Sequence, residues 1–462
     1  MASASPDAIR EPGLGPDAAL FTDLYELTMA GSYHALGMVA PATFDLYAHR
    51  LPPRRGYLVA CGLEVALDYL EQLRFDDAAL DYLRSLGLFE ESFLRHLGDL
   101  RFTGDVWAVP EGEVVFPDEP LVRVTAPLVE AQIVETFLLN CIGFQTLIAT
   151  KAARIASVCG DRSFVDFSPR RDHGTDAAMK AARAAFVGGA SGTSLVLAGR
   201  ELGLELSGTM AHAYVMRFSD ERDAFLSFAR AYPGKAVLLL DTYDTEAAAQ
   251  LVAAMAPQLR AEGIVPRAVR LDSGDFTALS RSVRRTLDDA GLGEIGIFAS
   301  GDLDEYRIAE IVASGATIDA FGVGTQLGTS GDAPSLDVVY KLVEDPTGPK
   351  VKVAPGKTTL PGRKQIYRVR DGEAYAHDVI ALEDEARVEG APVLEHVMAG
   401  GRRTRRREPL AAARDRRAAA VAALAPHVRS IDAGAPGYEV RLAPALEALT
   451  RKLRAEHGHA GA

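Results

Sequence analysis

Short apolar runs alternate with amphipathic stretches between about residues 160 and 330. The apolar runs are SFVDF (163–167), AVLLLD (236–241), AVRLD (268–272), IGIFAS (295–300) and IDAFGVG (318–324). Stretches of helical periodicity follow the second, third and fourth runs, and each ends on a glycine of the kind that closes a helix. This alternation predicts parallel strands joined by crossover helices.

Polar or glycine-rich residues follow each predicted strand. They read FSPRRDHG, LDTYDT, LDSGD, ASGD and GVGTQLG. In an α/β barrel, the loops at the carboxyl ends of the strands converge on one face, where ligands bind. We therefore expect an α/β fold whose barrel carries its functional residues in these loops.

The flanking segments have a different pattern. Residues 104–126 alternate apolar and polar positions with Pro and Gly between them, as antiparallel strands do, and residues 350–400 look similar. We expect a mixed α/β domain built from residues 19–135 and 346–462, with the barrel over 136–345 inserted between its halves.

The two ends of the chain carry further signals. Residues 1–18 are polar and rich in Pro and Gly, which predicts a mobile tail. Near the other end, Leu446, Leu449 and Leu453 fall at helical spacing and are expected to cover the core of the mixed domain.

Composition narrows the class of protein. The 462 residues carry a formal net charge of -13, which disfavours a nucleic-acid or anionic-membrane binder and favours a small ligand. The three cysteines lack CxxC spacing, and no apolar run reaches the roughly 20 residues of a membrane span, so we expect a cytoplasmic protein. The basic run GRRTRRREP (401–409) is expected to be a solvated loop rather than a nucleic-acid arm.

Carboxylates gather at two predicted strand ends. They are Asp241, Asp244, Asp272 and Asp275, beside Arg270. Either they form an ion-pair network, or they bind ribose hydroxyls and a Mg²⁺-diphosphate, which requires hard oxygen ligands. A histidine metal site is not expected, because of the ten histidines only His457 and His459 lie close together.

Glycines and arginines in other loops could bind anions. Gly301 and Gly324 follow strands, so they serve either as tight turns or as sites where main-chain N–H groups approach a phosphate. Arg170 and Arg171 offer a fork for a planar carboxylate or a phosphate.

His212 ends the stretch SGTMAH, whose small residues leave open room around the imidazole. A lone histidine beside a strand is often a packed core residue. Alternatively, a neutral imidazole is a competent nucleophile toward phosphorus if a carboxylate holds its other nitrogen. Asp241 is the predicted holder.

Together these motifs resemble the nicotinate phosphoribosyltransferase family. The segments that carry the resemblance are FTDLYELTMAGSY (21–33), FDLYAHRLPPRRGYLVACGLE (44–64), FSPRRDHG, SGTMAH, LLDTYDT, VRLDSGD, FASGDLDEY, FGVGTQLGTS and KTTLPGRKQIYR. The resemblance implies an irregular α/β barrel of the type II phosphoribosyltransferases joined to a mixed α/β domain, as a head-to-tail homodimer with sites at the interface. It also implies transfer of phosphoribosyl from phosphoribosyl pyrophosphate to nicotinate with Mg²⁺, coupled to ATP hydrolysis through a phosphorylated histidine.

The resemblance also assigns roles to residues. It implies that nicotinate is held by Tyr25, Arg170 or Arg171, Thr209 and Arg270. It places the ribose and its metal at Asp272, gives Asp241 the task of orienting His212, and puts the 5′-phosphate at Gly301, Gly324 and Thr325.

Two further positions bear on the substrate. Leu195 stands where the related nicotinamide enzyme has an aspartate; a carboxylate there would repel nicotinate, so its absence favours the acid over the amide. Ala213 departs from relatives that carry a hydroxyl beside the histidine, which puts any hydrogen bond from that position in doubt.

Other functions stay open from the sequence. A phosphoribosyltransferase for nicotinamide or quinolinate would share the scaffold, but the quinolinate enzyme needs no phosphohistidine, so ATP stimulation separates it. A non-catalytic metabolite-binding protein would be suggested by loss of His212 or Asp272, and both are present. An unrelated barrel lyase or hydrolase would be active without phosphoribosyl pyrophosphate.

Overall fold

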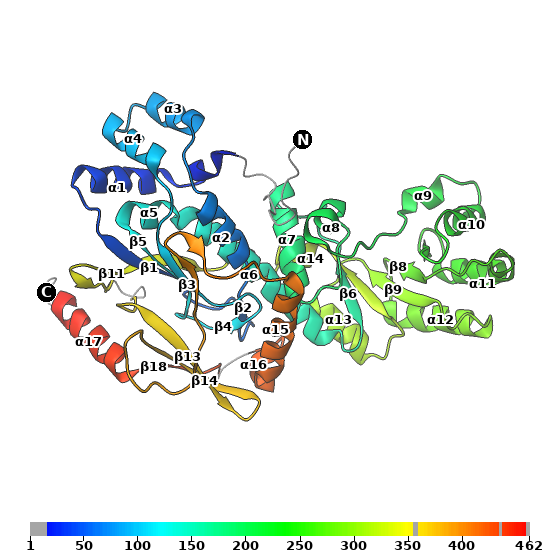
Figure 1. The fold of residues 1–462 in the computed structure, drawn as a ribbon. Coiled ribbons are helices and arrows are strands. Elements are labelled where there is room, and N and C mark those ends of the chain that lie inside the picture. The colour runs from blue at the N-terminus through cyan, green and yellow to red at the C-terminus, as the bar shows by residue number, and fades with distance from the viewer. Residues whose placement is uncertain (1–15, 354–358, 434–436, 459–462) are drawn as a thin grey trace. The chain divides into compact units, whose positions relative to one another are not determined.

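The structure is a computed structural model that describes residues 16–353, 359–433 and 437–458. The chain forms two compact units. Unit 1 contains residues 1–150 and 333–462, and unit 2 contains residues 151–332. Figure 1 labels their helices and strands.

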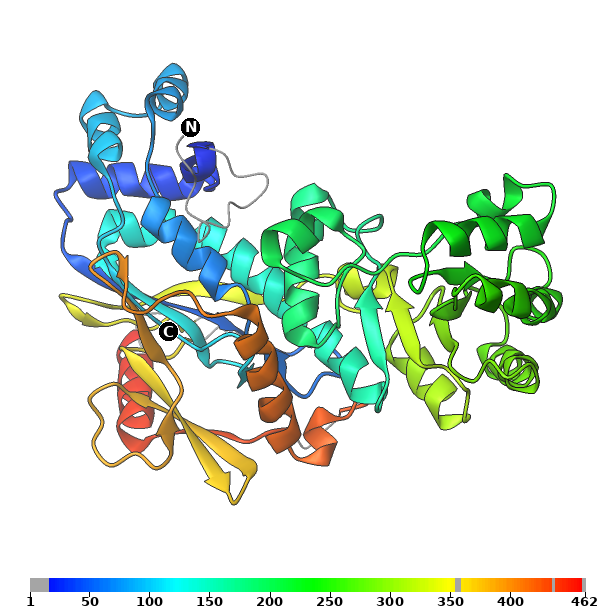
Figure 2. The ribbon, with the colours of Figure 1, turned by 45° about the vertical axis from the view of Figure 1, so that its right-hand side comes forward.

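Unit 2 is built on a five-stranded parallel sheet in the order β6-β10-β9-β8-β7. The strands are β6 (Ser163–Asp166), β7 (Val237–Leu239), β8 (Ala268–Leu271), β9 (Gly296–Ser300) and β10 (Ala320–Val323). They coincide with the five predicted runs. The predicted crossover helices are α11 (Thr245–Ala261), α12 (Phe276–Asp289) and α13 (Glu305–Ala313). Figure 2, turned toward unit 2, shows these helices beside the strands.

Irregular structure extends this sheet beyond β6. Single bridges join Asp166 to Thr193 and Thr193 to Leu206, both in the parallel sense. The connecting helices are α7 (Thr175–Gly188), α8 (Val196–Leu202), α9 (His212–Met216) and α10 (Glu221–Ala231). The fold of unit 2 is thus α/β with a parallel sheet, as predicted in outline.

Aspartates start the crossover helices. The Asp244 carboxylate accepts a hydrogen bond from the N–H of Ala247 at 2.8 Å, and Asp275 accepts from Thr277 and Ala278 at 3.0 and 3.1 Å. Such caps satisfy amide groups that have no partner within the helix. Asp244 and Asp275 therefore each have a structural role as helix caps.

Unit 1 holds a seven-stranded antiparallel sheet in the order β12-β11-β1-β5-β3-β16-β17. Its strands are β1 (Pro41–Ala48), β3 (Asp105–Ala108), β5 (Pro120–Pro127), β11 (Val338–Asp345), β12 (Gly348–Pro349), β16 (Glu395–Ala399) and β17 (Arg402–Arg403). A four-stranded sheet contains β13 (Lys364–Asp371), β14 (Ala374–Leu382), β15 (Ala391–Pro392) and β18 (Val440–Leu442), and a small ribbon pairs β2 (Leu58–Val59) with β4 (Val114–Val115). Antiparallel strands thus occur in both predicted segments.

Helices flank these sheets. They are α1 (Leu24–Ala35), α2 (Leu63–Gln72), α3 (Asp77–Ser85), α4 (Glu91–Asp99), α5 (Leu128–Ile133), α6 (Glu135–Val158), α15 (Leu410–Ala423), α16 (Pro426–Arg429) and α17 (Pro444–Gly458). Helix α17 contacts β14, and its Leu446 is fully buried, as the leucine spacing predicts.

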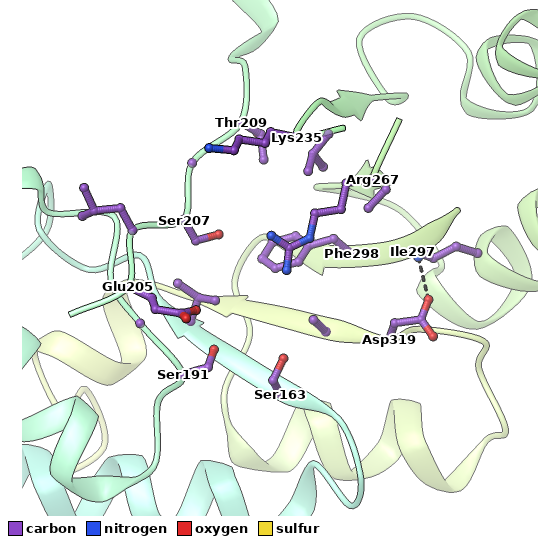
Figure 3. A pocket seen from close by; sticks show the side chains of 18 of the residues that line it. Ser163, Ser191, Glu205, Ser207, Thr209, Lys235, Arg267, Ile297, Phe298 and Asp319 are labelled. Atoms are coloured by element: carbon purple, nitrogen blue, oxygen red, sulfur yellow. Dashed lines mark hydrogen bonds between the residues drawn. The ribbon is translucent and has the colours of Figure 1, made fainter. Parts of the chain in front are cut away.

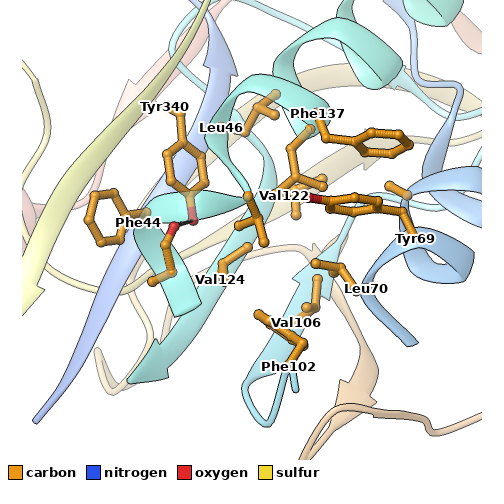
Figure 4. Close-up of a cluster of buried hydrophobic side chains, with 14 of the residues drawn as sticks. Phe44, Leu46, Tyr69, Leu70, Phe102, Val106, Val122, Val124, Phe137 and Tyr340 are labelled. Atoms are coloured by element: carbon orange, nitrogen blue, oxygen red, sulfur yellow. Dashed lines mark hydrogen bonds between the residues drawn. The ribbon is translucent and has the colours of Figure 1, made fainter. Parts of the chain in front are cut away.

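The core of unit 1 joins both halves of the chain (Figure 4). The ring of Phe44 stacks on Tyr340 with centroids 4.8 Å apart, and Tyr69 stacks on Phe137 at 3.7 Å. The Tyr340 hydroxyl donates to the carbonyl of Ala131 at 2.9 Å. Burying such aromatic surface is a main source of stability and ties residues from the carboxyl-terminal half to the amino-terminal half.

The domain boundaries differ from those predicted. The division falls at 150/151 and 332/333 rather than at 135/136 and 345/346, and α6 runs across the first boundary. Strand β11 belongs to unit 1 because it pairs along its length with β1. At the amino terminus, residues 1–15 lie outside the described part, whereas Pro16–Leu20 forms a 3-10 helix whose Ala19 is buried, so the predicted tail is too long.

The basic run is only partly a solvated loop: Arg402 and Arg406 are exposed, but other arginines of the run are paired. Arg403 pairs with three carboxylates on α2: Glu64, Asp68 at 2.7 Å and Glu71 at 3.1 Å. Arg407 also pairs with Asp68. These acids recur at helical spacing on one face of α2, so an acidic stripe attracts the basic segment.

The structure bears on the two features from which a cytoplasmic location was expected, the cysteines and the apolar runs. Cys61, Cys141 and Cys159 are free and buried. Within the described part of the chain, no helix is both long and apolar enough to cross a membrane.

Candidate active site

The candidate site lies where the strands of unit 2 end. His212 is the first residue of α9, and 42% of its side chain is exposed. Its Nδ1 lies 3.1 Å from the hydroxyl of Thr242, and its Nε2 lies 3.9 Å from Oδ2 of Asp272. The imidazole is therefore held on one side and accessible to solvent, unlike a histidine packed in a core.

Arg270 and Asp272 are joined in a tight network. The guanidinium of Arg270 donates to Asp272 at 2.5 Å through Nη2, to Ser300 at 2.8 Å through Nε and to Thr209 at 2.9 Å through Nη1. Both Arg270 and Asp272 extend from the end of β8, while Ser300 ends β9. The network fixes Arg270 in one orientation across neighbouring strands.

The electrostatics favour an ionised Asp272. Burial alone would raise the pKa of this carboxyl, but hydrogen bonds from Ser300 and Arg270, with the charge of Arg270, outweigh burial and lower it. The hydroxyl of Ser300 donates to Oδ1 at 2.5 Å, so that oxygen is occupied. Asp272 therefore presents a negative Oδ2 toward His212.

Asp241 does not hold His212, contrary to the prediction. Its Oδ2 accepts from the hydroxyl of Ser273 at 2.5 Å and from the N–H of Asp272 at 3.3 Å. Thr242, the next residue, takes the predicted place at Nδ1 of His212. Asp241 and Thr242 lie in the turn that follows β7, and this turn directs the Thr242 side chain, not that of Asp241, to the ring.

The residues fit a magnesium ion that arrives with a diphosphate. Oδ1 of Asp241 is buried and has no hydrogen-bond partner within the described part of the chain, and Oδ2 of neighbouring Asp272 is free of the Ser300 and Arg270 contacts. Carboxylate oxygens are the ligands that Mg²⁺ prefers. Among the described residues no cluster of three or more metal-binding side chains exists, so any ion there would depend on substrate oxygens.

Arg170 and Arg171 follow β6 in a turn in which the N–H of Arg171 donates to the carbonyl of Ser168 at 2.7 Å. Both are exposed, and neither guanidinium has a hydrogen bond or ion pair within the described chain. By contrast, Arg270 lies 5.9 Å from the ring of Phe167 and is fully occupied by protein partners. The free arginines are thus the ones able to bind an incoming anion.

The two glycine loops differ. Gly301 has φ +100, and a Cβ there would lie 1.9 Å from the carbonyl oxygen of Asp272, so only glycine fits. Gly324 precedes the single turn α14 (Thr325–Gly328), and Thr325 is exposed. Gly301 therefore has a structural reason to be glycine, which accounts for its presence whether or not it binds phosphate.

Not every predicted residue falls in this group. Tyr25 lies on α1 in unit 1, is 47% exposed, and its pKa is raised by burial and by nearby Glu135 and Glu26. Leu195 precedes α8 and is half-buried, and Ala213 is the second residue of α9. The structure thus groups Thr209, His212, Arg270 and Asp272 in one network, whereas Tyr25 is described with the other unit.

Some residues of interest escaped the sequence reasoning. Thr242, Ser273 and Ser300 all lie in the strand-end motifs. A hydroxyl residue next to a strand-end aspartate is the sequence feature that could have identified them. Unit 1 also has a pocket of about 220 Å³ lined by Arg50, Lys341, Lys352 and His49. The pairing of β1 with β11 brings Lys341 to the same pocket as His49 and Arg50, and Arg50 pairs there with Asp337 at 2.7 Å.

Comparisons with known proteins show the family of the chain. The nicotinate phosphoribosyltransferase N-terminal domain matches residues 20–143, and the nicotinate phosphoribosyltransferase family matches residues 162–344. The chain belongs to the nicotinate phosphoribosyltransferase family. It is therefore an enzyme by family, and residues 162–344 include all the strand-end loops described above.

Individual relatives agree. Nicotinate phosphoribosyltransferase pncB2 of Mycobacterium tuberculosis is 47% identical, covering 94% of each chain. The Bacillus subtilis nicotinate phosphoribosyltransferase is 45% identical over 79% of this chain and 76% of its own. The crystal structure of human nicotinic acid phosphoribosyltransferase superposes with a TM-score of 0.84 at 27% identity, covering 94% of this chain and 99% of the human one.

Proposed function

We propose that the protein transfers phosphoribosyl from phosphoribosyl pyrophosphate to nicotinate, giving nicotinate mononucleotide and pyrophosphate in NAD salvage. ATP hydrolysis drives the reaction through His212. The observation that carries the proposal is the half-exposed His212 ring, held by Thr242 beside the Arg270–Asp272 network, in a chain of this family. The proposed scaffold is the irregular type II phosphoribosyltransferase barrel.

The phosphoryl step follows from the imidazole geometry. With its proton on Nδ1, His212 donates to the hydroxyl of Thr242 and keeps a lone pair on Nε2. That lone pair attacks the γ-phosphorus of ATP, the N–P bond forms, and the bond to the ADP oxygen breaks. Hydrolysis of the N–P bond then returns the imidazole and releases phosphate.

The transfer step uses the rest of the site. Arg170 or Arg171 binds the nicotinate carboxylate, with Thr209 and Arg270 shaping the pocket. Asp272 binds the ribose hydroxyls, and Gly301, Gly324 and Thr325 receive the 5′-phosphate. A Mg²⁺ held by Asp241 and Asp272 would neutralise diphosphate charge. The nicotinate nitrogen forms the bond to the ribose C1, and pyrophosphate leaves with the electron pair of the broken C–O bond.

Other members of the wider group remain as alternatives. The nicotinate-nucleotide pyrophosphorylase structure from Pyrococcus furiosus has a TM-score of 0.71 at 26% identity, covering 88% of this chain. A chain that acts on quinolinate would show no ATP stimulation. A nicotinamide enzyme would turn over the amide, which the absence of a carboxylate at Leu195 disfavours. We also propose a homodimer and a cytoplasmic location.

The deciding experiment combines turnover with phosphate labelling. Purified protein with nicotinate and phosphoribosyl pyrophosphate should form nicotinate mononucleotide faster when ATP is present. His212→Ala should keep only a slow rate that ATP does not change, and it should take up no acid-labile label from γ-labelled ATP. His427→Ala, an exposed histidine on α16 in unit 1, is the control and should behave as the unmodified protein. Equal labelling of His212→Ala would disprove the phosphohistidine.

A further inference from the structure

A second cavity lies at the opposite ends of the strands of unit 2. Its volume is about 780 Å³, and the first residue of every strand of the parallel sheet lines it: Ser163, Val237, Ala268, Gly296 and Ala320. In barrel folds the interior is usually filled by branched side chains. Here Ser163, Ala268, Gly296 and Ala320 have small side chains or none, which leaves room for the cavity at this end of the sheet.

Aromatic and polar groups face this cavity. Phe298 lines it from β9, while Phe228 and Tyr232 line it from α10 and the residue that follows that helix. In Figure 3, the guanidinium of Arg267 and the hydroxyl of Ser207 both point into the space between the strands. The cavity therefore combines an apolar wall with polar groups, as small-molecule sites do.

Some charged side chains around the cavity have hydrogen-bond partners and others do not. The Asp319 carboxylate accepts a hydrogen bond from the N–H of Ile297 at 2.7 Å. Arg267 and Lys235 line the same cavity, and neither side chain has a hydrogen bond or ion pair within the described part of the chain. Glu205 lines the wall formed by residues 205–209, and its carboxylate could accept from a donor group of a ligand. Arg267 and Lys235 supply unpaired positive charge for an anionic group of an occupant, while Glu205 and Asp319 balance the charge of the cavity as a whole.

The cavity is separate from the catalytic loops but touches them at one point. His212, Asp241 and Asp272 do not line it, whereas Thr209 does. The hydroxyl of Thr209 accepts from Nη1 of Arg270 at 2.9 Å, and the Arg270 side chain is only 14% exposed. The Thr209–Arg270 pair therefore lies between the cavity and the candidate active site.

We propose that this cavity is a second ligand site that takes a small organic anion with an aromatic or aliphatic body. The anionic group pairs with Arg267 and Lys235, and the body packs against Phe298 and Tyr232. Because Thr209 is shared, an occupant changes the position of Arg270. If the proposed function holds, the occupant therefore changes the KM for nicotinate more than kcat.

Binding of 2-naphthalenesulfonate tests the site without relying on activity. Its binding, measured by saturation-transfer NMR and calorimetry, is expected to be saturable, and 2-naphthalenemethanol, the neutral analogue, should bind at least about tenfold more weakly. Arg267→Glu and Lys235→Glu should each weaken naphthalenesulfonate by about tenfold or more. The matched control is Arg285→Glu, an exposed arginine on α12 outside the cavity, which should bind as the unmodified protein does.

A filled cavity gives the second arm. Ala320→Leu places a larger side chain in the cavity and should abolish binding, whereas Ala290→Leu, at the exposed end of α12, should not. Equal affinity of Arg267→Glu and Arg285→Glu would overturn the proposal, as would competitive displacement of the probe by nicotinate. If the unmodified protein binds the probe but forms no nicotinate mononucleotide, the proposed function is wrong and the second ligand site still stands.

Discussion

At the scale of single residues, the hydroxyl of Thr242 is the direct partner of the candidate nucleophile. Thr242→Val removes the hydrogen bond to Nδ1 of His212 while keeping the side-chain shape. One hydrogen bond contributes about 1 kcal/mol, so we expect the ATP-stimulated rate to fall by roughly fivefold to tenfold. Steady-state assays should show this loss, and Thr242→Ser should restore most of the rate. A Thr242→Val enzyme with full ATP stimulation would mean that the ring is oriented by something else.

Ser300 controls the ionisation of Asp272. Ser300→Ala removes one of the hydrogen bonds that lower the pKa of Asp272, so this pKa should rise. Since the ionised carboxylate is the active form in the proposed mechanism, the acid limb of the pH–rate profile should move to higher pH. The profile of kcat/KM between pH 4 and 8 measures the shift. An unchanged limb would show that Asp272 does not set it.

At the scale of elements, the strands and crossover helices of unit 2 were predictable, since their hydrophobic period and terminal glycines are local signals. The domain boundaries were not, because the pairing of β11 with β1 is a contact between distant segments. Contacts between distant segments also limited the prediction of the candidate site. His212 follows no strand and begins α9, and its contact with Thr242 instead of Asp241 depends on side-chain direction within one loop.

The close approach of the Gly301 loop to the end of β8 gives a stability prediction. Gly301→Ala places a Cβ against the Asp272 carbonyl at a positive φ, so it should destabilise unit 2 by roughly 3 kcal/mol or more. Gly291→Ala, at φ +67 with no atom within 4 Å of the new Cβ, should cost only about 1 kcal/mol. Urea unfolding measures both free energies. Equal losses would show that the contact with Asp272 can relax.

The turn after β6 should make stability depend on pH. Burial, and then the neighbouring charge of Asp166, raise the pKa of Asp172 from its ordinary value of 3.8 to about 6. A raised carboxyl pKa means that the folded state binds more protons than the unfolded chain between these values. The contribution of Asp172 to stability is thus fully present below about pH 4 and is lost as pH rises through 6.

Asp172→Asn removes this dependence. We expect the variant to exceed the unmodified protein in unfolding free energy by roughly 1–2 kcal/mol at pH 7.5 and to match it near pH 4. Urea titrations across this range measure the difference, with Asp161→Asn, an exposed site, as the control. A difference that is constant with pH would mean that Asp172 titrates normally.

At the scale of the whole molecule, the division into two units predicts that each can be destabilised by itself. The basic segment acts within unit 1, because Arg403 neutralises Glu64, a carboxylate whose side chain is only 3% exposed on α2. Removing the partner of a buried charge costs more than removing an exposed pair, since the remaining charge stays out of water. Among the described residues, Arg407 still pairs with one of the three acids, Asp68.

Arg403→Ala should therefore lower the unfolding free energy of unit 1 by about 2–4 kcal/mol, whereas Arg402→Ala, at an exposed position, should change it by less than about 0.5 kcal/mol. Hydrogen exchange resolves the units: amides of α2 and β1 should exchange faster in Arg403→Ala, and those of β8 and β9 should not. The reverse pattern is expected for Gly301→Ala. If both variants accelerate exchange in both units equally, the chain unfolds as one cooperative body, and the division at residues 150 and 332 has no energetic counterpart.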